Sequence, residues 1–327
     1  MAKTLVTGAT GFTGGAVCGR LAGEGAEVVA FVRGSSNTEK LRRLGVEIRA
    51  VDICDLADVK RNFDGIDTVY HIAAAYRSEH ASHDEFFRVN VGATKNLLDV
   101  ASDAGVKRFV HCSTVGVQGA IDDPPATEDY RAQPGDHYQQ SKLEGELLAR
   151  KYFDEPRLPG TVVRPVGIYG PGDTRFLKLF RSIAKGRFVM IGSGDVLYHM
   201  TYIDDLVSGF LLAGTKPEAV GEVFTIGGPE YTTLKVLVER IARSLGVKPP
   251  RLRIPFMPVY LASVVCDRLC RSVGVSPPLY PRRVEFFELD RAFSIDKARD
   301  LLGYVPAYSL DEGLARTAGW YRQNGLV

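Results

Sequence analysis

A tyrosine and a lysine four residues apart are suited to share one proton-transfer site. In the segment DHYQQSK they are Tyr138 and Lys142, and residues with this spacing in a helix lie on one face. A free tyrosine has a pKa of about 10, and a nearby ammonium group favours its phenolate form. The pair could then move a proton to or from a substrate oxygen. Because the pattern is frequent by chance, its meaning depends on the elements that position it.

Those elements are strands that alternate with helices. Apolar, β-branched runs such as LVTGA, EVVAFV, DTVYHIAA and RFVHCST are separated by helical segments of about 10 to 15 residues. Runs that are apolar on both faces indicate a parallel sheet covered by helices on each side. The predicted fold is therefore α/β, a doubly wound Rossmann domain over residues 1–170, to which residues 195–228 return. Residues 171–327 are expected to form mainly a smaller, mixed α/β substrate cap.

A glycine-rich loop follows the first strand directly. In TLVTGATGFTGG the glycines stand between a strand and a helix, where they let the backbone approach a pyrophosphate at the helix N-terminus. The later strand ends VDICD and HIAAA offer positions beside the adenine and small side chains beside the cofactor. The predicted cofactor contacts from these segments are Thr7, Gly8, Gly11, Phe12, Thr13, Gly14, Asp52, Ile53, Ala73, Ala74 and Ala75.

The end of the second strand bears on the choice between NAD and NADP. An acid there would bind the ribose 2′-hydroxyl of NAD, whereas a base accommodates the 2′-phosphate of NADP. This strand ends in Arg33, with no acid nearby, and arginine matches phosphate geometry well. The sequence therefore favours NADP over NAD. The alternative is that Arg33 stacks on the adenine without discriminating between the two.

Composition excludes several other classes of protein. The 327 residues are 45% hydrophobic with a net charge of +2, which is typical of a soluble globular protein and gives no reason to expect a nucleic-acid partner. No apolar run approaches the roughly 20 residues of a membrane span, and the first residues do not resemble a secretory signal. Five scattered cysteines favour a reducing, cytoplasmic location. Cys266 and Cys270 lack companion ligands, so they are expected to pack rather than bind metal.

Seven segments in sequence order identify a family. With TGATGFTG, DICD, HIAA, FFRVNVGATKNLL, STVGVQG, YQQSK and RPVGIYGPGD, the chain resembles the extended short-chain dehydrogenases/reductases over essentially its full length. The resemblance makes Tyr138 the general acid/base and Lys142 its partner, and Asn90 supports the site. Thr114 is the hydrogen-bond donor to the substrate oxygen, with Ser113 beside it as the alternative.

The same resemblance implies a reaction and further contacts. Hydride moves between a substrate carbon and the nicotinamide while the tyrosine transfers the proton. The backbone at Arg164, Pro165 and Val166 borders the nicotinamide. Ser113, Pro165, Val166, Tyr138 and Lys142 therefore join the predicted cofactor contacts. Members of the family often dimerise through the helices that carry Asn90 and Tyr138, so a homodimer is expected.

Within the family, the sequence is most similar to 3β-hydroxysteroid dehydrogenases/isomerases and sterol-4-carboxylate dehydrogenases. This implies a small-molecule substrate, a hydroxysteroid-like or lipid-like alcohol or ketone. A nucleotide-sugar epimerase with tightly bound NAD is the alternative, although VQG replaces the usual VYG and Gly167 replaces a common asparagine. A non-catalytic NAD(P) sensor is a remote third interpretation, because such sensors typically lose the tyrosine or the lysine.

Three features outside these motifs have open interpretations. For the apolar, proline-containing stretch 254–280 there are three interpretations: it lines a substrate pocket, it touches a membrane surface, or it forms the core of the cap. His199 is expected to be a structural hydrogen-bond donor. A row of basic residues is interpreted as a diphosphate site or a solvated helix face; it comprises Arg175, Lys178, Arg181, Lys185 and Arg187.

Overall fold

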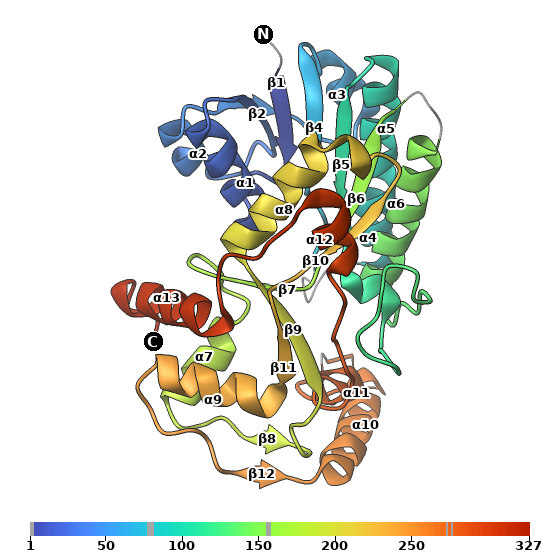
Figure 1. Ribbon diagram of the computed structural model, residues 1–327. Coiled ribbons are helices and arrows are strands. Elements are labelled where there is room, and N and C mark those ends of the chain that lie inside the picture. Colours follow the sequence, from blue (N-terminus) through green and yellow to red (C-terminus); the bar gives the residue numbers. More distant parts are fainter. Residues whose placement is uncertain (1–2, 77–81, 155–157, 273, 276) are drawn as a thin grey trace.

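A seven-stranded parallel sheet forms the centre of the larger part of the molecule (Figure 1). The computed structural model describes residues 3–327 except 77–81, 155–157, 273 and 276. The strand order is β10-β6-β5-β4-β1-β2-β3. The strands are β1 (Lys3–Thr7), β2 (Glu27–Val32), β3 (Glu47–Ala50), β4 (Ile66–His71), β5 (Arg108–Cys112), β6 (Gly160–Pro165) and β10 (Val223–Ile226).

Helices cover both faces of this sheet, as the apolar strands predict. Neighbouring residues of β1 show why: Leu5 packs into one buried cluster with α3, α5 and α6, while Val6 packs into another with α1 and α8. Both side chains are fully buried, and a doubly wound sheet requires this. The helices are α1 (Phe12–Gly23), α2 (Glu39–Arg43), α3 (Leu56–Asn62), α4 (His83–Phe87), α5 (Thr94–Asp103), α6 (His137–Phe153) and α8 (Ile203–Thr215). The predicted fold class is confirmed.

The remaining segments form a smaller part with its own sheets. The order β11-β9-β7 joins β7 (Gly167–Tyr169), β9 (Leu197–Tyr202) and β11 (Tyr231–Thr233), and β8 (Met190–Ile191) pairs with β12 (Arg253–Ile254). Its helices are α7 (Leu177–Ala184), α9 (Leu234–Ser244), α10 (Phe256–Ser272), α11 (Pro281–Glu285) and α13 (Leu310–Gln323), whereas α12 (Asp296–Leu302) packs against β10 and α8 of the larger part. None of the described helices has the length and apolar character to cross a bilayer.

The chain passes between the two parts within residues 195–228. Strand β9 belongs to the three-stranded sheet, and α8 follows it directly and packs against β5 and β6. Strand β10 then joins the edge of the large sheet, where it pairs in parallel with β6. This segment therefore ties the small sheet to the large one.

Candidate active site

The loop between β1 and α1 is shaped so that only glycine fits. Gly8 has φ +69°, and a Cβ at this position would lie 2.7 Å from the Ala73 nitrogen at the end of β4. A Cβ on Gly14 would lie 2.3 Å from the Gly8 carbonyl oxygen. Both distances are far below van der Waals contact, so the loop is a cradle with no room for side chains.

The start of α1 leaves backbone donors available to an anion. Gly11 caps the helix without a side-chain hydrogen bond, and the first turn holds no acidic residue. The first helical hydrogen bond runs from the Gly15 nitrogen to the Gly11 oxygen at 2.9 Å, so the amides of Phe12 and Thr13 have no acceptor within the helix. A pyrophosphate fits the cradle and this positive helix end.

A buried chain of hydrogen bonds leads from this loop toward α5. The Thr7 hydroxyl accepts from the Ile72 and Ala73 amides at 3.1 Å each and contacts His71 Nδ1 at 2.8 Å. His71 Nε2 contacts the Thr94 hydroxyl at 2.9 Å, and Thr94 donates to the Asn90 carbonyl at 2.8 Å. This pattern requires a neutral His71 that carries its proton on Nε2. Burial lowers the pKa of His71 to about 3, which keeps it neutral.

Asn90 continues the chain to the helix of the Tyr–Lys pair. It lies in a π-helical turn over Arg88–Ala93, and its side chain accepts from the Ala75 amide at 2.8 Å and donates to the Ser141 hydroxyl at 2.9 Å. Ser141 in turn donates to the Tyr138 carbonyl at 2.8 Å. Gly145 permits this packing, because a Cβ there would lie 2.4 Å from the Asn90 oxygen. Asn90 thus fixes α6 against the end of β4.

Lys142 is buried beneath the site, one helical turn from Tyr138. It is 3% exposed, and its Nζ donates to the Cys112 carbonyl at the end of β5 at 2.6 Å. Burial lowers the pKa of Lys142, and the Glu146 carboxylate acts in the opposite direction. Tyr138 is half-buried, and its ring packs edge-on against Tyr76 with centroids 5.2 Å apart. The structure therefore places the two groups as the sequence predicts, while their catalytic roles stay predictions.

Thr114 and Ser113 stand at the end of β5 and differ in their partners. Thr114 caps the 3₁₀ turn Val115–Gln118, where its hydroxyl accepts from the Gly116 amide at 3.1 Å. This turn contacts α6. Ser113 is 4% exposed, and its hydroxyl donates to Glu146 Oε2 at 2.5 Å. In these contacts the Ser113 hydroxyl uses its hydrogen on Glu146, whereas the Thr114 hydroxyl acts as an acceptor and can still donate its hydrogen.

Glu146 and Arg164 form a buried ion pair that the sequence reasoning missed. Arg164 donates to Glu146 at 3.1 Å through Nε and at 2.5 Å through Nη2, and the two side chains are 6% and 0% exposed. The same arginine donates to the Glu128 carbonyl at 2.8 Å and precedes Pro165 and Val166, both buried. The sequence spacing could have indicated Glu146, because it lies four residues after Lys142 and therefore on the same face of the helix.

Gln118 explains the departure from the VYG pattern. Its side chain is fully buried and donates to the Thr127 carbonyl at 2.6 Å, which fastens the loop that leads to α6. Gly119 has φ +70°, and a Cβ there would lie 2.1 Å from the Gln133 oxygen. The VQG sequence therefore closes a packed turn and does not present a side chain to the site.

The predicted adenosine contacts lie after β2, β3 and β4. Arg33 directly follows β2 and is exposed. Asp52 is also exposed and accepts from the Cys54 amide at 2.9 Å, while the Ile53 carbonyl accepts from Asn96 at 3.1 Å. Ala73, Ala74 and Ala75 follow β4 beside the glycine loop. Ala73 borders the cradle directly, since a Cβ on Gly8 would lie 2.7 Å from its nitrogen, and the contacts of all these residues to a cofactor stay predictions.

Two further expectations meet specific contacts. His199 is 4% exposed and its Nε2 contacts the Gly228 carbonyl at 2.9 Å, so this nitrogen is a donor, as expected. The basic row is not one helix face, since α7 covers only Leu177–Ala184. Arg175 pairs with Asp173 at 2.7 Å and lies over the Phe12 ring, and Arg181 donates to the Leu326 carbonyl at 2.7 Å.

Comparison with known proteins decides the family. A sequence model of the NAD dependent epimerase/dehydratase family matches residues 4–227, which include the cradle, the Tyr–Lys pair and the return through β10. The chain belongs to this family. The predicted extended short-chain dehydrogenase/reductase is thereby confirmed, and the protein is an enzyme that binds a nicotinamide dinucleotide.

Named relatives within the epimerase/dehydratase family include steroid dehydrogenases. The chain is 31% identical to the 3 beta-hydroxysteroid dehydrogenase/Delta 5-->4-isomerase of Mycobacterium tuberculosis, over 98% of this chain and 90% of that protein. It is 30% identical to 3beta-hydroxysteroid-dehydrogenase/decarboxylase isoform 2 of Arabidopsis thaliana over 85% of its length, and it spans 52% of that longer protein. Among solved structures, UDP-glucuronic acid 4-epimerase from Bacillus cereus in complex with NAD has a TM-score of 0.76 at 25% identity, covering 98% of this chain and 99% of that one.

Proposed function

We propose that this enzyme transfers a hydride between NAD(P) and a secondary alcohol or ketone of hydroxysteroid-like or lipid-like character. The observation that carries the proposal is the buried Lys142, held by the Cys112 carbonyl one turn from the half-buried Tyr138. The relatives named as 3β-hydroxysteroid dehydrogenases support this substrate class, and the match to the Mycobacterium protein extends over nearly the whole chain.

The site residues divide the work as follows. NAD(P), held at the glycine loop between β1 and α1, would supply the hydride chemistry. Lys142 holds a positive charge beside Tyr138 and stabilises the phenolate, so that Tyr138 exchanges a proton with the substrate oxygen. Thr114 accepts from the Gly116 amide, which leaves its own hydrogen for the substrate oxygen as charge develops there. Asn90 positions Tyr138 through Ser141.

We further propose that the enzyme prefers NADP to NAD. Arg33 is exposed at the end of β2, and the residues beside it, Gly34 and Ser35, carry no acid that would repel a 2′-phosphate. An arginine is suited to bidentate phosphate binding. The kcat/KM values for NADP and NAD test this, and a preference for NAD of more than about tenfold would contradict it.

The second candidate is a nucleotide-sugar 4-epimerase with bound NAD. The structural similarity to the Bacillus cereus epimerase favours it. Against it, Gln118 and Gly119 form a closed turn, and two members of the basic row, Arg175 and Arg181, already have protein partners. The two functions differ in one observable, because a dehydrogenase changes the redox state of added cofactor and an epimerase does not.

The decisive experiment follows NADPH absorbance with a panel of 3β-hydroxysteroids and 3-ketosteroids, and product analysis with UDP-sugars. We expect turnover of the steroid-like panel and no sugar interconversion. Tyr138→Phe should abolish turnover and leave cofactor binding intact, while Lys142→Ala should weaken both. Tyr76→Phe is the matched control, because it removes a hydroxyl from the ring beside Tyr138. Sugar epimerisation without net redox change, or near-normal turnover by Tyr138→Phe, would overturn the proposal.

We also propose that the enzyme is a cytoplasmic homodimer that associates through the helices carrying Asn90 and Tyr138. Its five cysteines are all free thiols, which suits a reducing compartment. On α6, Leu147 is 45% exposed, as expected for a residue that a second helix would cover. Light scattering coupled to size exclusion measures the mass directly, and a monomer at micromolar concentration would contradict the dimer.

A further inference from the structure

Helix α10 presents an apolar stripe to the outside of the molecule. Every fourth residue from 257 to 269 is large, apolar and more than half exposed: Met257 (58%), Leu261 (58%), Val265 (56%) and Leu269 (63%). Residues with this spacing share one helix face. Ser263 is the one buried residue among those described in this helix, so α10 is not a core helix.

Exposed apolar side chains are concentrated in this part of the chain. Of the fifteen large exposed apolar residues in the described structure, eight lie between 252 and 280. Besides the stripe they are Leu252, Ile254, Val275 and Tyr280. Soluble proteins rarely expose a contiguous apolar patch of this kind unless it meets a partner or a membrane. The stretch 254–280 therefore does not form the core of the cap, one of the interpretations left open by the sequence.

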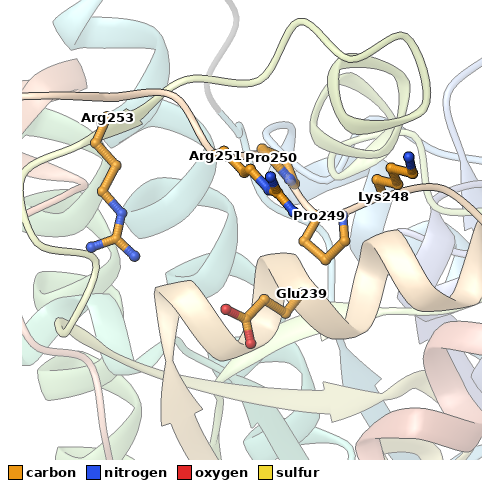
Figure 2. A pocket seen from close by; sticks show the side chains of 6 residues that line it. All are labelled: Glu239, Lys248, Pro249, Pro250, Arg251 and Arg253. Carbon is orange, nitrogen blue, oxygen red and sulfur yellow. The ribbon is translucent and has the colours of Figure 1, made fainter.

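The segment that contains the stripe is basic. Residues 248–280 contain five basic residues and one acid, Asp267, whose carboxylate pairs with Arg271 at 2.9 Å. Immediately before α10, a surface cavity of about 450 Å³ is lined by Glu239, Lys248, Pro249, Pro250, Arg251 and Arg253. Figure 2 shows these basic residues along the segment beside α9, from which Glu239 projects. Three cationic side chains and one carboxylate line the cavity, so it favours an anionic group.

We propose that α10 and the preceding basic segment 248–254 form a docking surface for an anionic phospholipid bilayer. The apolar stripe enters the interface, while Lys248, Arg251 and Arg253 bind lipid phosphates. At 17 residues, α10 lies in the interface and does not cross it. The surface lies at the end of the molecule away from the large sheet, so docking leaves the cofactor cradle uncovered (Figure 1).

The positive charge near α10 favours a bilayer over a second copy of the chain as the partner of the apolar stripe. In a two-fold interface the same patch meets itself, so the basic side chains around α10 would face their own copies. That arrangement brings like charges together as water is removed, which opposes association. An anionic bilayer instead neutralises these cations and accepts the apolar side chains. The proposal does not rest on the substrate proposed above.

The test is co-sedimentation of the full-length protein with lipid vesicles. We expect binding to phosphatidylcholine vesicles containing about 30% phosphatidylserine, weak binding to pure phosphatidylcholine, and loss of binding in about 0.5 M NaCl. The double variant Leu261→Glu/Val265→Glu should weaken binding by at least tenfold. The variant Arg251→Glu/Arg253→Glu should also weaken it by at least tenfold, because each reversed charge removes an attraction to the surface.

The matched control introduces two glutamates at exposed apolar positions outside the patch. Leu301 and Val305 are 42% and 77% exposed outside the patch, so Leu301→Glu/Val305→Glu should bind vesicles like the wild type. Thermal unfolding and cofactor binding confirm that each variant is folded. Absence of binding to anionic vesicles, equal binding to neutral ones, or undiminished binding by the α10 variant would overturn the proposal. Loss of dimers in the α10 variant without vesicle binding would assign the face to a second copy.

Discussion

Removing the Glu146 carboxylate should destabilise the protein far more than removing any surface acid. Glu146 is fully buried and accepts three hydrogen bonds, two from Arg164 and one from Ser113. Glu146→Ala leaves the Arg164 guanidinium buried with its hydrogen bond to the Glu128 carbonyl as compensation. Breaking a buried ion pair by removing one partner costs about 3–5 kcal/mol, and this pair has the burial and geometry to reach that range.

Urea unfolding followed by circular dichroism measures this cost. Glu144→Ala is the matched control on the same helix, since Glu144 is half-buried and accepts one side-chain hydrogen bond, from Gln140. We expect the control to lose less than about 1 kcal/mol. Adding Arg164→Met to Glu146→Ala should recover part of the loss, because the uncompensated charge is then gone. A loss below about 1 kcal/mol for Glu146→Ala, or strictly additive effects of the two substitutions, would refute the reasoning.

Two other perturbations follow from the buried glycines and histidines. Gly14→Ala places a Cβ where it would lie 2.3 Å from the Gly8 oxygen, so NAD(P) affinity measured by fluorescence titration should fall at least tenfold; unchanged affinity would show that the loop is not the cofactor cradle. Burial lowers the pKa of both His71 and His111, to about 3 for His71, so below about pH 6.5 the unfolded chain binds protons that the native state refuses. Stability should therefore fall as the pH drops from about 6.5 toward 3, with His71 contributing about 2 kcal/mol by pH 5 and His111 acting in the same direction. The variant His111→Leu should lose less stability than the wild type between pH 7 and pH 5 in urea unfolding, and an equal loss would contradict this assignment.

Sequence patterns predicted the elements that depend on local periodicity. The runs that became β2 and β6 are buried almost throughout, and a run that is apolar on both faces indicates a covered parallel sheet. Gly8, Gly11 and Gly14 were predictable as a loop because a strand-to-helix turn near a phosphate requires glycine at those places. The spacing of Tyr138 and Lys142 placed both on one helix face, and the structure has them on α6.

Contacts between distant segments could not be predicted in the same way. His71 and His111 lie in two different strands, and only the parallel pairing of β4 with β5 sets them opposite each other, with ring centroids 5.5 Å apart. Gln118 was visible only as a departure from a pattern, because its partner carbonyls belong to a later loop. The basic row was expected as one helix, but α7 ends at Ala184 and its neighbours turn to other partners.

The hydrogen-bond chain from Thr7 to Tyr138 also constrains the order of folding. Three of its links join residues that are 64, 23 and 51 positions apart in sequence, so these three require that strands and helices distant in the chain have docked. Contacts with such long sequence separation form late, because loop closure must come first. The glycine loop and α6 are therefore expected to become ordered in the same late step of folding. We expect the backbone amides of α6 to exchange with solvent more slowly once NAD(P) is bound.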